Sequence, residues 1–352
     1  MSSLWLAFSA ASLVTIIVMA ALRPVAERLD FVDRPGGRKI HDAQVPVVGG
    51  LAMWVGFFVG SAVLPAEVRP PLVATALGFM FVTLGLLDDR FSLSAVFRLA
   101  VQGLGAIAMV LLGGLAVHFV GSPFGPETVV FDGWVATVLC VFLVAGAMNA
   151  MNMVDGIDGL AGSLAALAFS AVATVALLSG NAEVLAIAVI AAGVSGAFLI
   201  FNLPLGFNRP IRAFMGDAGS LFLGFLLSWS LIALSQDSSS IVSPVTLLWF
   251  IAIPIFDMGS TAIGRLAKGH SPFFADTTHL HHSLLRRGLP VPGALAVLIA
   301  MAIFWIGVGW TLDRVLSLPD YVSLLAFIAA GGVTHAAIRF GDPGSKVSKP
   351  VP

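Results

Sequence analysis

The chain has 352 residues, of which 58% are hydrophobic and 11% are charged, with a formal net charge of −1 and a mean hydropathy of +1.00. A soluble domain of this size would need a far more polar surface, and a transmembrane β-barrel would show short alternating segments in place of unbroken apolar runs. The only cysteine, Cys140, excludes an intrachain disulfide.

Apolar runs follow one another along the chain, and about eleven of them have a length near that needed to cross a bilayer. They lie near residues 4–22, 47–64, 71–87, 96–114, 134–151, 160–179, 184–203, 218–235, 244–264, 292–312 and 321–338. The first run has no signal-peptide cleavage pattern, so we expect it to be retained. The sequence therefore predicts an all-α polytopic membrane protein, with one transmembrane domain over residues 1–340 and a disordered cytoplasmic tail over 341–352.

Basic residues are distributed unequally between the two sides of these runs. All of the 18 Lys and Arg residues except Arg69 and Arg314 fall on one side. The positive-inside rule makes that side cytoplasmic, with the N-terminus outside and the C-terminus inside. Four short acidic clusters fall on the same side, where acids and bases together suit a metal ion and an anionic substrate.

The first acidic cluster, Asp88-Asp89, ends the third run. Two adjacent carboxylates at the interface can hold Mg²⁺, or one of them can act as a base. The alternative is a solvated helix end that pairs with Arg90.

The second cluster contains Asn149, Asn152, Asp155 and Asp158 at intervals of three residues. On a helix, this spacing would bring neighbouring side chains together into a polar ladder. Helix capping would account for one or two of these residues but not for all four, so we expect a functional site here.

The third and fourth clusters are Phe214 to Asp217 and the histidine-rich segment that holds His279, His281 and His282 with Asp276. Asp217 precedes an apolar run and could be its N-cap, while Phe214 could stack on a base. The histidine segment lacks thiolates, which favours phosphate contact over a zinc site; contact of this basic loop with lipid headgroups is the third alternative.

Five segments resemble the motifs of the polyprenyl-phosphate N-acetylhexosamine-1-phosphate transferases, the glycosyltransferase 4 family. They are RKIHDAQVPVVGGLAM (38–53), GLLDDR (85–90), NAMNMVDGIDGLAG (149–162), FMGDAGSLFLG (214–224) and HLHHSLLRRG (279–288). The histidine motif is similar to the WecA and TagO branch rather than to the more distant MraY branch. The resemblance implies Mg²⁺-dependent transfer, with Mn²⁺ as an alternative ion, of a sugar 1-phosphate from a UDP-sugar to undecaprenyl phosphate with release of UMP.

The resemblance also implies roles for individual residues. Asp217 corresponds to the Mg²⁺ ligand, with Asp88 as a second ligand or as the acid that orients the lipid phosphate beside Asp89. Asp155 and Asp158 correspond to acids of the nucleotide and metal region, with Asp158 expected to contact uracil. The expected substrate-binding residues are Asn149, Asn152, Phe214, Arg265, His279, His281 and His282, with Arg265 among the basic side chains that stabilise the bridging oxygen.

The expected donor is UDP-GlcNAc, and the close alternative is another UDP-N-acetylhexosamine, with N-acetylfucosamine or N-acetylquinovosamine, in O-antigen initiation. From a different class, an ion-coupled transporter or lipid flippase remains open, because membrane aspartates also serve ion pathways. A transporter would place its acids near the bilayer midplane, whereas these gather on one face. We expect a multi-pass protein of the bacterial inner membrane with a cytoplasmic active site, membrane lipids and a homodimer as further partners, and no nucleic acid partner.

Overall fold

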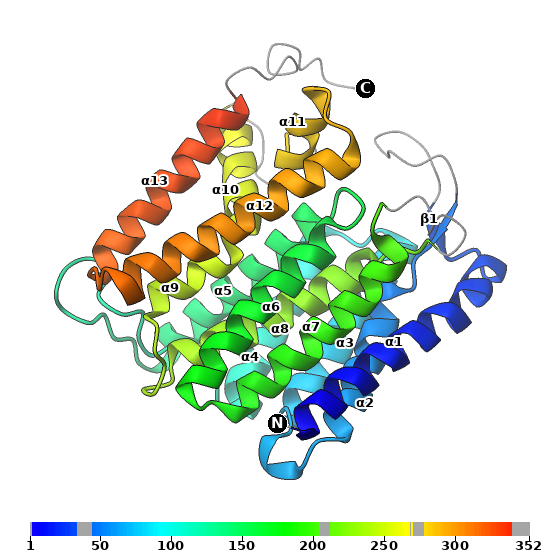
Figure 1. Cartoon of the computed structure of the whole chain (residues 1–352), viewed down its shortest axis with the longest axis horizontal. Coiled ribbons are helices and arrows are strands. Elements are labelled where there is room, and N and C mark those ends of the chain that lie inside the picture. Colours follow the sequence, from blue (N-terminus) through cyan, green and yellow to red (C-terminus); the bar gives the residue numbers. More distant parts are fainter. Residues whose placement is uncertain (1, 34–43, 205–211, 268, 270–277, 340–352) are drawn as a thin grey trace.

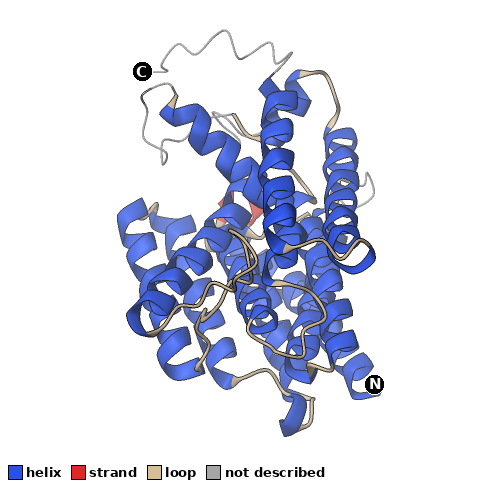
Figure 2. Ribbon diagram, turned by 90° about the vertical axis from the view of Figure 1, so that its left-hand side faces the viewer, coloured by secondary structure: helices blue, strands red, loops and turns tan. Residues whose placement is uncertain are grey.

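The computed structural model describes residues 2–33, 44–204, 212–267, 269 and 278–339. Figures 1 and 2 show a bundle of helices that run side by side, with one small pair of strands. The predicted tail at 341–352 and Asp276 lie outside the described residues.

The helices follow the predicted apolar runs in order. Their bounds are α1 Ser2–Arg28, α2 Gly49–Ala62, η1 Ala66–Val68, α3 Leu72–Phe91, α4 Ala95–Gly113, α5 Gly133–Val154, α6 Leu160–Ser179, α7 Ala182–Asn202, α8 Gly216–Ser235, α9 Pro244–Leu248, η3 Trp249–Ile251, α10 Ala252–Leu266, α11 Leu280–Arg286, α12 Val291–Trp310, η4 Thr311–Val315 and α13 Asp320–Arg339. The strands β1 (Val32–Asp33) and β2 (Val45–Pro46) pair antiparallel.

Ten helical stretches in the described part of the chain are long and apolar enough to cross a membrane, which confirms the all-α polytopic class. The run predicted at 47–64 forms the shorter helix α2 of 14 residues. At 1.5 Å per residue, a helix of this length covers about 21 Å of a hydrocarbon core of about 30 Å. It packs against α1, α7 and α8 inside the bundle.

The predicted run at 244–264 is continuously helical but is not a single α-helix, because the 3₁₀ turn η3 joins α9 to α10. Pro254 lies in the first turn of α10 and has no N–H to donate to the carbonyl four residues earlier. The change of helix type therefore occurs where an α-helical hydrogen bond cannot form.

Helix α8 lies at the centre of the bundle, and 89% of the residues in its most apolar stretch are buried. Close packing is possible because glycines face it: a Cβ atom at Gly85 of α3 would lie 2.2 Å from the Ala218 nitrogen, and one at Gly50 of α2 would lie 2.4 Å from the Gly219 nitrogen. Without side chains at these positions, the backbones approach directly. This packing brings the acidic end of α3 against the first turn of α8.

Candidate active site

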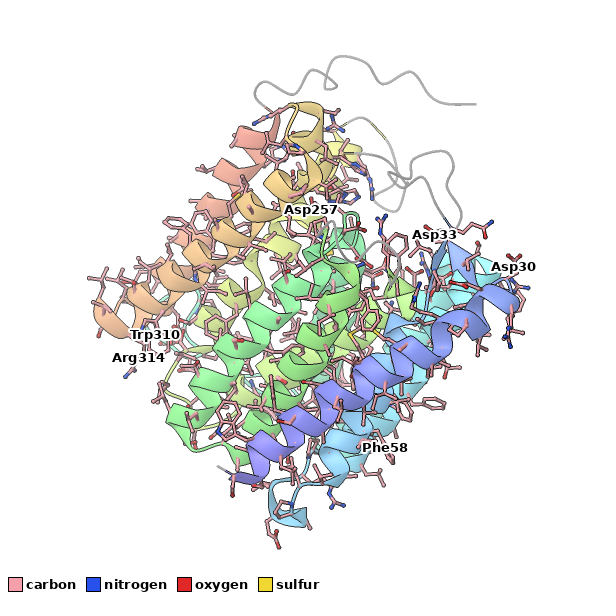
Figure 3. All side chains as sticks on the ribbon, turned by 45° about the vertical axis from the view of Figure 1, so that its right-hand side comes forward. Asp30, Asp33, Phe58, Asp257, Trp310 and Arg314 are labelled. Carbon is pink, nitrogen blue, oxygen red and sulfur yellow. The ribbon has the colours of Figure 1, made fainter. Side chains whose placement is uncertain are left out.

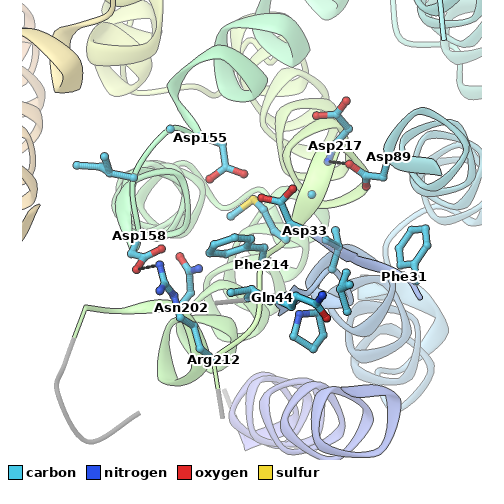
Figure 4. A pocket seen from close by; sticks show the side chains of 18 of the residues that line it. Phe31, Asp33, Gln44, Asp89, Asp155, Asp158, Asn202, Arg212, Phe214 and Asp217 are labelled. Carbon is cyan, nitrogen blue, oxygen red and sulfur yellow. Dashed lines mark hydrogen bonds and ion pairs between the residues drawn. The ribbon is translucent and has the colours of Figure 1, made fainter. Parts of the chain in front are cut away.

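A cavity of about 990 Å³ opens at the end of the bundle where α8 begins. It is lined by residues of the β1–β2 region, the end of α3, the α5–α6 loop and the segment that enters α8 (Figure 4), and also by residues of other elements, such as His282 of α11. The predicted site residues on its wall are Asp89, Asn152, Asp155, Asp158, Phe214, Asp217 and His282. Together with residues 44–47, they show that all five motif segments of the sequence meet around one space.

Asp89 holds the first turn of α8 in place. Its Oδ1 accepts a hydrogen bond from the Asp217 backbone nitrogen at 3.0 Å, and its Oδ2 lies 3.5 Å from the Ala218 nitrogen. Gly216, with φ of +66°, leaves room for this contact, since a Cβ atom there would lie 2.4 Å from Asp89 Oδ2. A carboxylate from α3 thus satisfies N–H groups that a helix start leaves without partners.

This contact shows that the N-cap alternative for Asp217 was wrong. Asp217 is the second residue of α8, and the capping carboxylate comes from Asp89. The Asp217 side chain is held elsewhere: Asn152 Nδ2 donates to its Oδ1 at 2.7 Å and also donates to Ser220 Oγ at 3.0 Å. Asn152, near the end of α5, therefore fixes the direction of the Asp217 carboxylate.

Arg98 joins the carboxylates of Asp88 and Asp217. Its Nη1 forms an ion pair with Asp88 Oδ2 and lies 3.5 Å from Asp217 Oδ2. Asp88 Oδ1 accepts the Leu93 backbone N–H at 2.8 Å, so both oxygens of this buried side chain are engaged. The alternative of a solvated Asp88 paired with Arg90 was wrong, because Asp88 is buried against Arg98 and Arg90 donates to the Asp30 carbonyl oxygen at 3.2 Å.

The polar ladder expected along one helix does not form, because α5 ends at Val154. Asp155 is the C-cap of α5, and Gly159, with φ of +81°, precedes α6. Asp155 and Asp158 therefore belong to a loop, residues 155–159, that bends around the cavity. On α5, Asn149 points away from it and donates to Gln102 Oε1 at 2.7 Å.

Asp155 faces the cavity, and no hydrogen bond to its carboxylate is found within the described part of the chain (Figure 4). Burial raises the pKa of Asp155 to about 7, and the negative charges of Asp89 and Asp158 add to the rise. A carboxyl group with this pKa can exchange a proton near neutral pH.

Asp158, Arg212 and Phe214 form the opposite wall (Figure 4). Arg212 Nη2 is paired with Asp158 Oδ2, and its guanidinium carbon lies 5.1 Å from the centre of the Phe214 ring. Phe214 is fixed by its own backbone, which donates to the Pro46 carbonyl at 2.9 Å. The wall thus offers an aromatic face, an acid and a guanidinium group side by side.

The 155–159 loop is tied to the segment that carries Arg212 and Phe214 by one buried amide. Asn202 accepts the Gly159 N–H at 2.7 Å through Oδ1 and donates to the Ala213 carbonyl at 3.0 Å through Nδ2. The relative position of these two segments is therefore set by the end of α7.

Among the predicted histidines, only His282 lines the cavity. His279 bonds to Asp257 of α10, while His281 is buried against Gly156, where a Cβ atom would lie 2.1 Å from His281 Nε2. Burial lowers the pKa of His281 well below its usual value, and the neighbouring charges of His282 and His279 lower it further. Arg265 is buried and lies outside the cavity lining, so its predicted role at the bridging oxygen has no support from its position.

Metal binding can be judged from the donor set. No group of three or more His, Cys, Asp and Glu side chains suited to a metal ion occurs among the described residues. Mg²⁺, however, is commonly held by one or two carboxylates together with water and substrate phosphates. Asp88 and Asp217 direct one oxygen each toward Nη1 of Arg98, so this cationic nitrogen occupies the point where the two carboxylates converge. Of the two, only Asp217 lines the cavity and could offer an oxygen to an ion held there with a substrate phosphate.

Three residues of this site were missed from the sequence: Arg98, Asn202 and Arg212. For Arg98 a signal existed, because a charged residue early in an apolar helix normally has a partner of opposite charge. Asn202 and Arg212 gave no comparable signal, since their roles depend on the packing of α7 against the start of α8.

Comparison with known proteins gives consistent results. Residues 71–235 match the sequence profile of glycosyl transferase family 4. The chain is 35% identical over 310 residues to the undecaprenyl-phosphate alpha-N-acetylglucosaminyl 1-phosphate transferase of Yersinia pestis, covering 88% of this chain and 84% of that protein. It is 34% identical to the Escherichia coli K12 protein of the same name, covering 90% and 86%, and 33% identical to the Haemophilus influenzae one, covering 96% and 94%.

Proposed function

Because the chain belongs to glycosyl transferase family 4, we propose that it transfers N-acetylglucosamine 1-phosphate from UDP-GlcNAc to undecaprenyl phosphate and releases UMP. The observation that carries the proposal is the meeting of Asp89, Asp155 and Asp217 in one cavity at the end of a membrane helix bundle. A phosphate-bearing soluble donor and a lipid acceptor can both reach such a place.

The second wall of the cavity suits the nucleotide. The Phe214 ring offers a face for stacking on uracil, and Asp158 offers a carboxylate that can accept a hydrogen bond from the N3–H of that base. Arg212 lies against both and holds the Asp158 carboxylate in place. The uridine would then lie along this wall with its diphosphate toward Asp217.

Mg²⁺ is the cofactor that we propose for the diphosphate, with Asp217 as the ligand that faces the cavity and Asp88 as the carboxylate directly behind it. When bound, the ion would neutralise the diphosphate and stabilise the charge that develops on the leaving UMP oxygen. Asn152 and Arg98 orient the Asp217 carboxylate, and Asp89 fixes the helix start that carries it.

The acceptor phosphate must attack the phosphorus that bears the sugar. Asp155 is the carboxylate whose pKa near 7 suits it to take a proton from a singly protonated lipid phosphate. Its position on the cavity wall, at the loop that follows a membrane helix, brings it within the region where a lipid headgroup and a soluble diphosphate meet.

The same arrangement bears on the transporter or flippase alternative. A transporter would place its acids near the bilayer midplane at the interface of two repeats. In this chain the acids of the cavity belong to helix ends and to the loops beside them, and the helices themselves are apolar. The position of the acids therefore favours the transferase.

The direct test is release of UMP by purified protein in detergent with undecaprenyl phosphate, Mg²⁺ and a panel of UDP-sugars. We expect release with UDP-GlcNAc that requires the lipid and is lost with EDTA. Release only with another UDP-N-acetylhexosamine would change the donor, for example to that of an O-antigen initiator. Absence of release with every donor, from folded protein, would contradict the proposal.

We also propose that the cavity faces the cytoplasm across the bacterial inner membrane. The buried Cys140 is the only cysteine of the chain, so a cysteine introduced elsewhere can be labelled selectively. Glu27→Cys, near the cavity, should react with an impermeant maleimide only after the cells are opened, whereas Glu67→Cys, at the other end of the bundle, should react in intact cells. The reverse pattern would contradict this orientation.

A further inference from the structure

Asp257 carries a buried carboxylate that has no role in the site as described above. It lies on α10, is 1% exposed, and does not line the cavity (Figure 3). A charged or polar group is costly to bury without partners, so the partners of Asp257 indicate why it is there.

Both carboxylate oxygens of Asp257 bind the segment that enters α11. Oδ2 lies 2.9 Å from His279 Nδ1, and Oδ1 accepts the Leu280 backbone N–H at 2.6 Å. A carboxylate that faces Nδ1 favours a proton on that nitrogen, which fixes both the ring orientation and the tautomer of His279. Asp257 therefore anchors the histidine side chain and the start of the helix at the same time.

The other end of α11 is anchored as well. Arg287, the C-cap of the helix, donates from Nη2 to the Ala337 carbonyl oxygen of α13 at 2.6 Å. A helix of seven residues makes few hydrogen bonds of its own, so its position depends on such external contacts.

Between these anchors, His282 lines the cavity and His281 packs against Gly156 of its wall. The His279 and His281 rings stack with centres 5.6 Å apart, and the His281 and His282 ring centres are 4.3 Å apart. His281 supports the backbone at Gly156, next to Asp155, while His282 lines the cavity itself. A shift at His279 would thus be transmitted to the 155–159 loop and to His282.

We propose that Asp257 is a positioning residue of the transfer reaction, which holds His279 and α11 so that His282 faces the substrate phosphates or sugar. This proposal rests on the proposed function. It differs from a purely structural role, in which Asp257 would stabilise the fold and affect every variant by the same factor.

A double-mutant cycle separates the two roles. Asp257→Asn keeps the size of the side chain and one oxygen for the Leu280 N–H, but removes the negative charge opposite His279. We expect Asp257→Asn and His282→Ala each to lower kcat/KM for UDP-GlcNAc about 10- to 100-fold, the range found when a supporting contact of a functional ligand is lost. The kcat/KM of the double variant should be no lower than that of the less active single variant, because the effects of residues that act through one another are not additive.

Ser260→Ala is the matched control. Ser260 lies one turn further along α10, is 5% exposed, and bonds to His335 Nδ1 at 2.6 Å, away from the cavity. This variant also loses a side-chain hydrogen bond to a histidine, here a partly buried one, yet should retain kcat/KM within about twofold. A multiplicative double variant, a His282→Ala protein with unchanged kinetics, or a folded Asp257→Asn protein with unchanged kinetics would overturn the proposal.

A second readout does not need turnover. In protein labelled with ¹⁵N-histidine, His279 should carry its proton on Nδ1 in the wild type and lose that preference in Asp257→Asn, while Ser260→Ala leaves it intact. Wild-type protein without UMP release would count against the proposed function alone; an unchanged His279 tautomer would count against the role of Asp257. If Asp257→Asn does not fold, His279→Gln combined with His282→Ala tests the same coupling.

Discussion

At the end of the bundle that carries Arg314 (Figure 3), Asp313 bonds only to a backbone N–H group and a hydroxyl among the described residues, whereas at the cavity end several carboxylates lie near one another and near a guanidinium group. Asp313 accepts the Ser243 N–H at 2.8 Å and the Thr246 hydroxyl at 2.7 Å, and so holds the start of α9, which Ser243 caps. Asp155, in contrast, faces the cavity close to other carboxylates. The environment rather than the residue type separates a structural aspartate from a functional one.

The largest expected effect on activity is found when one aspartate at each end of the bundle is replaced by asparagine and the two variants are compared. Asp217→Asn should lower kcat at least about 100-fold, the scale of losing one electrostatic contact to the transition state, while the protein remains folded. Asp313→Asn should leave kcat unchanged and lower the free energy of unfolding by about 1 kcal/mol through loss of one hydrogen bond at the start of α9. Kinetics and thermal denaturation of both variants check this pair; a folded but inactive Asp313→Asn would break the comparison.

The pH dependence of stability should also differ. Because the pKa of Asp155 is about 7 in the folded protein, the folded state holds this proton more tightly than the unfolded state, whose pKa is near 3.9. The stability that this tighter proton binding contributes to the folded state is therefore fully present below about pH 4 and is lost as the pH rises through about 7. Because asparagine does not ionise, Asp155→Asn avoids this loss of stability. The variant should be more stable than the wild type by up to about 4 kcal/mol at pH 8 and by much less at pH 5.

Thermal denaturation in detergent with EDTA at the two pH values measures this difference. Asp313→Asn, whose carboxylate is hydrogen-bonded at the opposite end, serves as the control and should show no gain at pH 8. An equal gain in stability at both pH values for Asp155→Asn would show that ionisation of the Asp155 carboxyl group does not destabilise the folded protein.

Gly156→Ala should disturb the contact between the 155–159 loop and α11. Its Cβ would lie 2.1 Å from His281 Nε2, so the loop or the imidazole must move. Overpacking of this kind costs about 1–3 kcal/mol, and displacement of Asp155 should lower kcat/KM about 10-fold. Gly196→Ala on α7, which meets nothing within 4 Å, should instead be neutral or stabilise by about 0.5–1 kcal/mol. Loss of activity in Gly196→Ala alone would contradict the assignment.

The smallest effect is expected for Arg212→Gln. Loss of the partly exposed pair with Asp158, worth about 1 kcal/mol or less, should raise KM for UDP-GlcNAc up to about fivefold with little change in kcat. Arg69→Gln removes a guanidinium group at the other end, where it donates to the Leu64 carbonyl, and should change neither constant. A fall in kcat without a change in KM would move Arg212 from the nucleotide wall to the reacting phosphates.

The sequence predicted the order and class of the helices, because long apolar runs permit only one backbone structure in a bilayer. It did not predict where each helix ends or which way the polar side chains near the ends point. The spacing of Asn149, Asn152 and Asp155 suggested one continuous helix, but α5 ends before Asp155, and Asn149 turns toward α4. Periodicity identifies a face of a helix only while the helix continues.

The partners of the predicted acids depend on tertiary packing and could not be read locally. Arg90 follows Asp88 and Asp89 in the chain, yet Arg98 of the next helix forms the ion pair, because the turn at Ser92, with φ of +51°, reverses the chain. The histidines were predicted as a group, but only His282 lines the cavity, since Asp257 draws His279 toward α10.

The most direct test of a single site at one end of the bundle is hydrogen exchange of the protein with and without UDP-GlcNAc and Mg²⁺, followed by mass spectrometry. We expect slower exchange in residues 152–160 and 212–219, which surround the cavity, and unchanged exchange in residues 236–243 at the opposite end. Protection confined to 236–243, or no protection at either end under saturating ligand, would contradict the account.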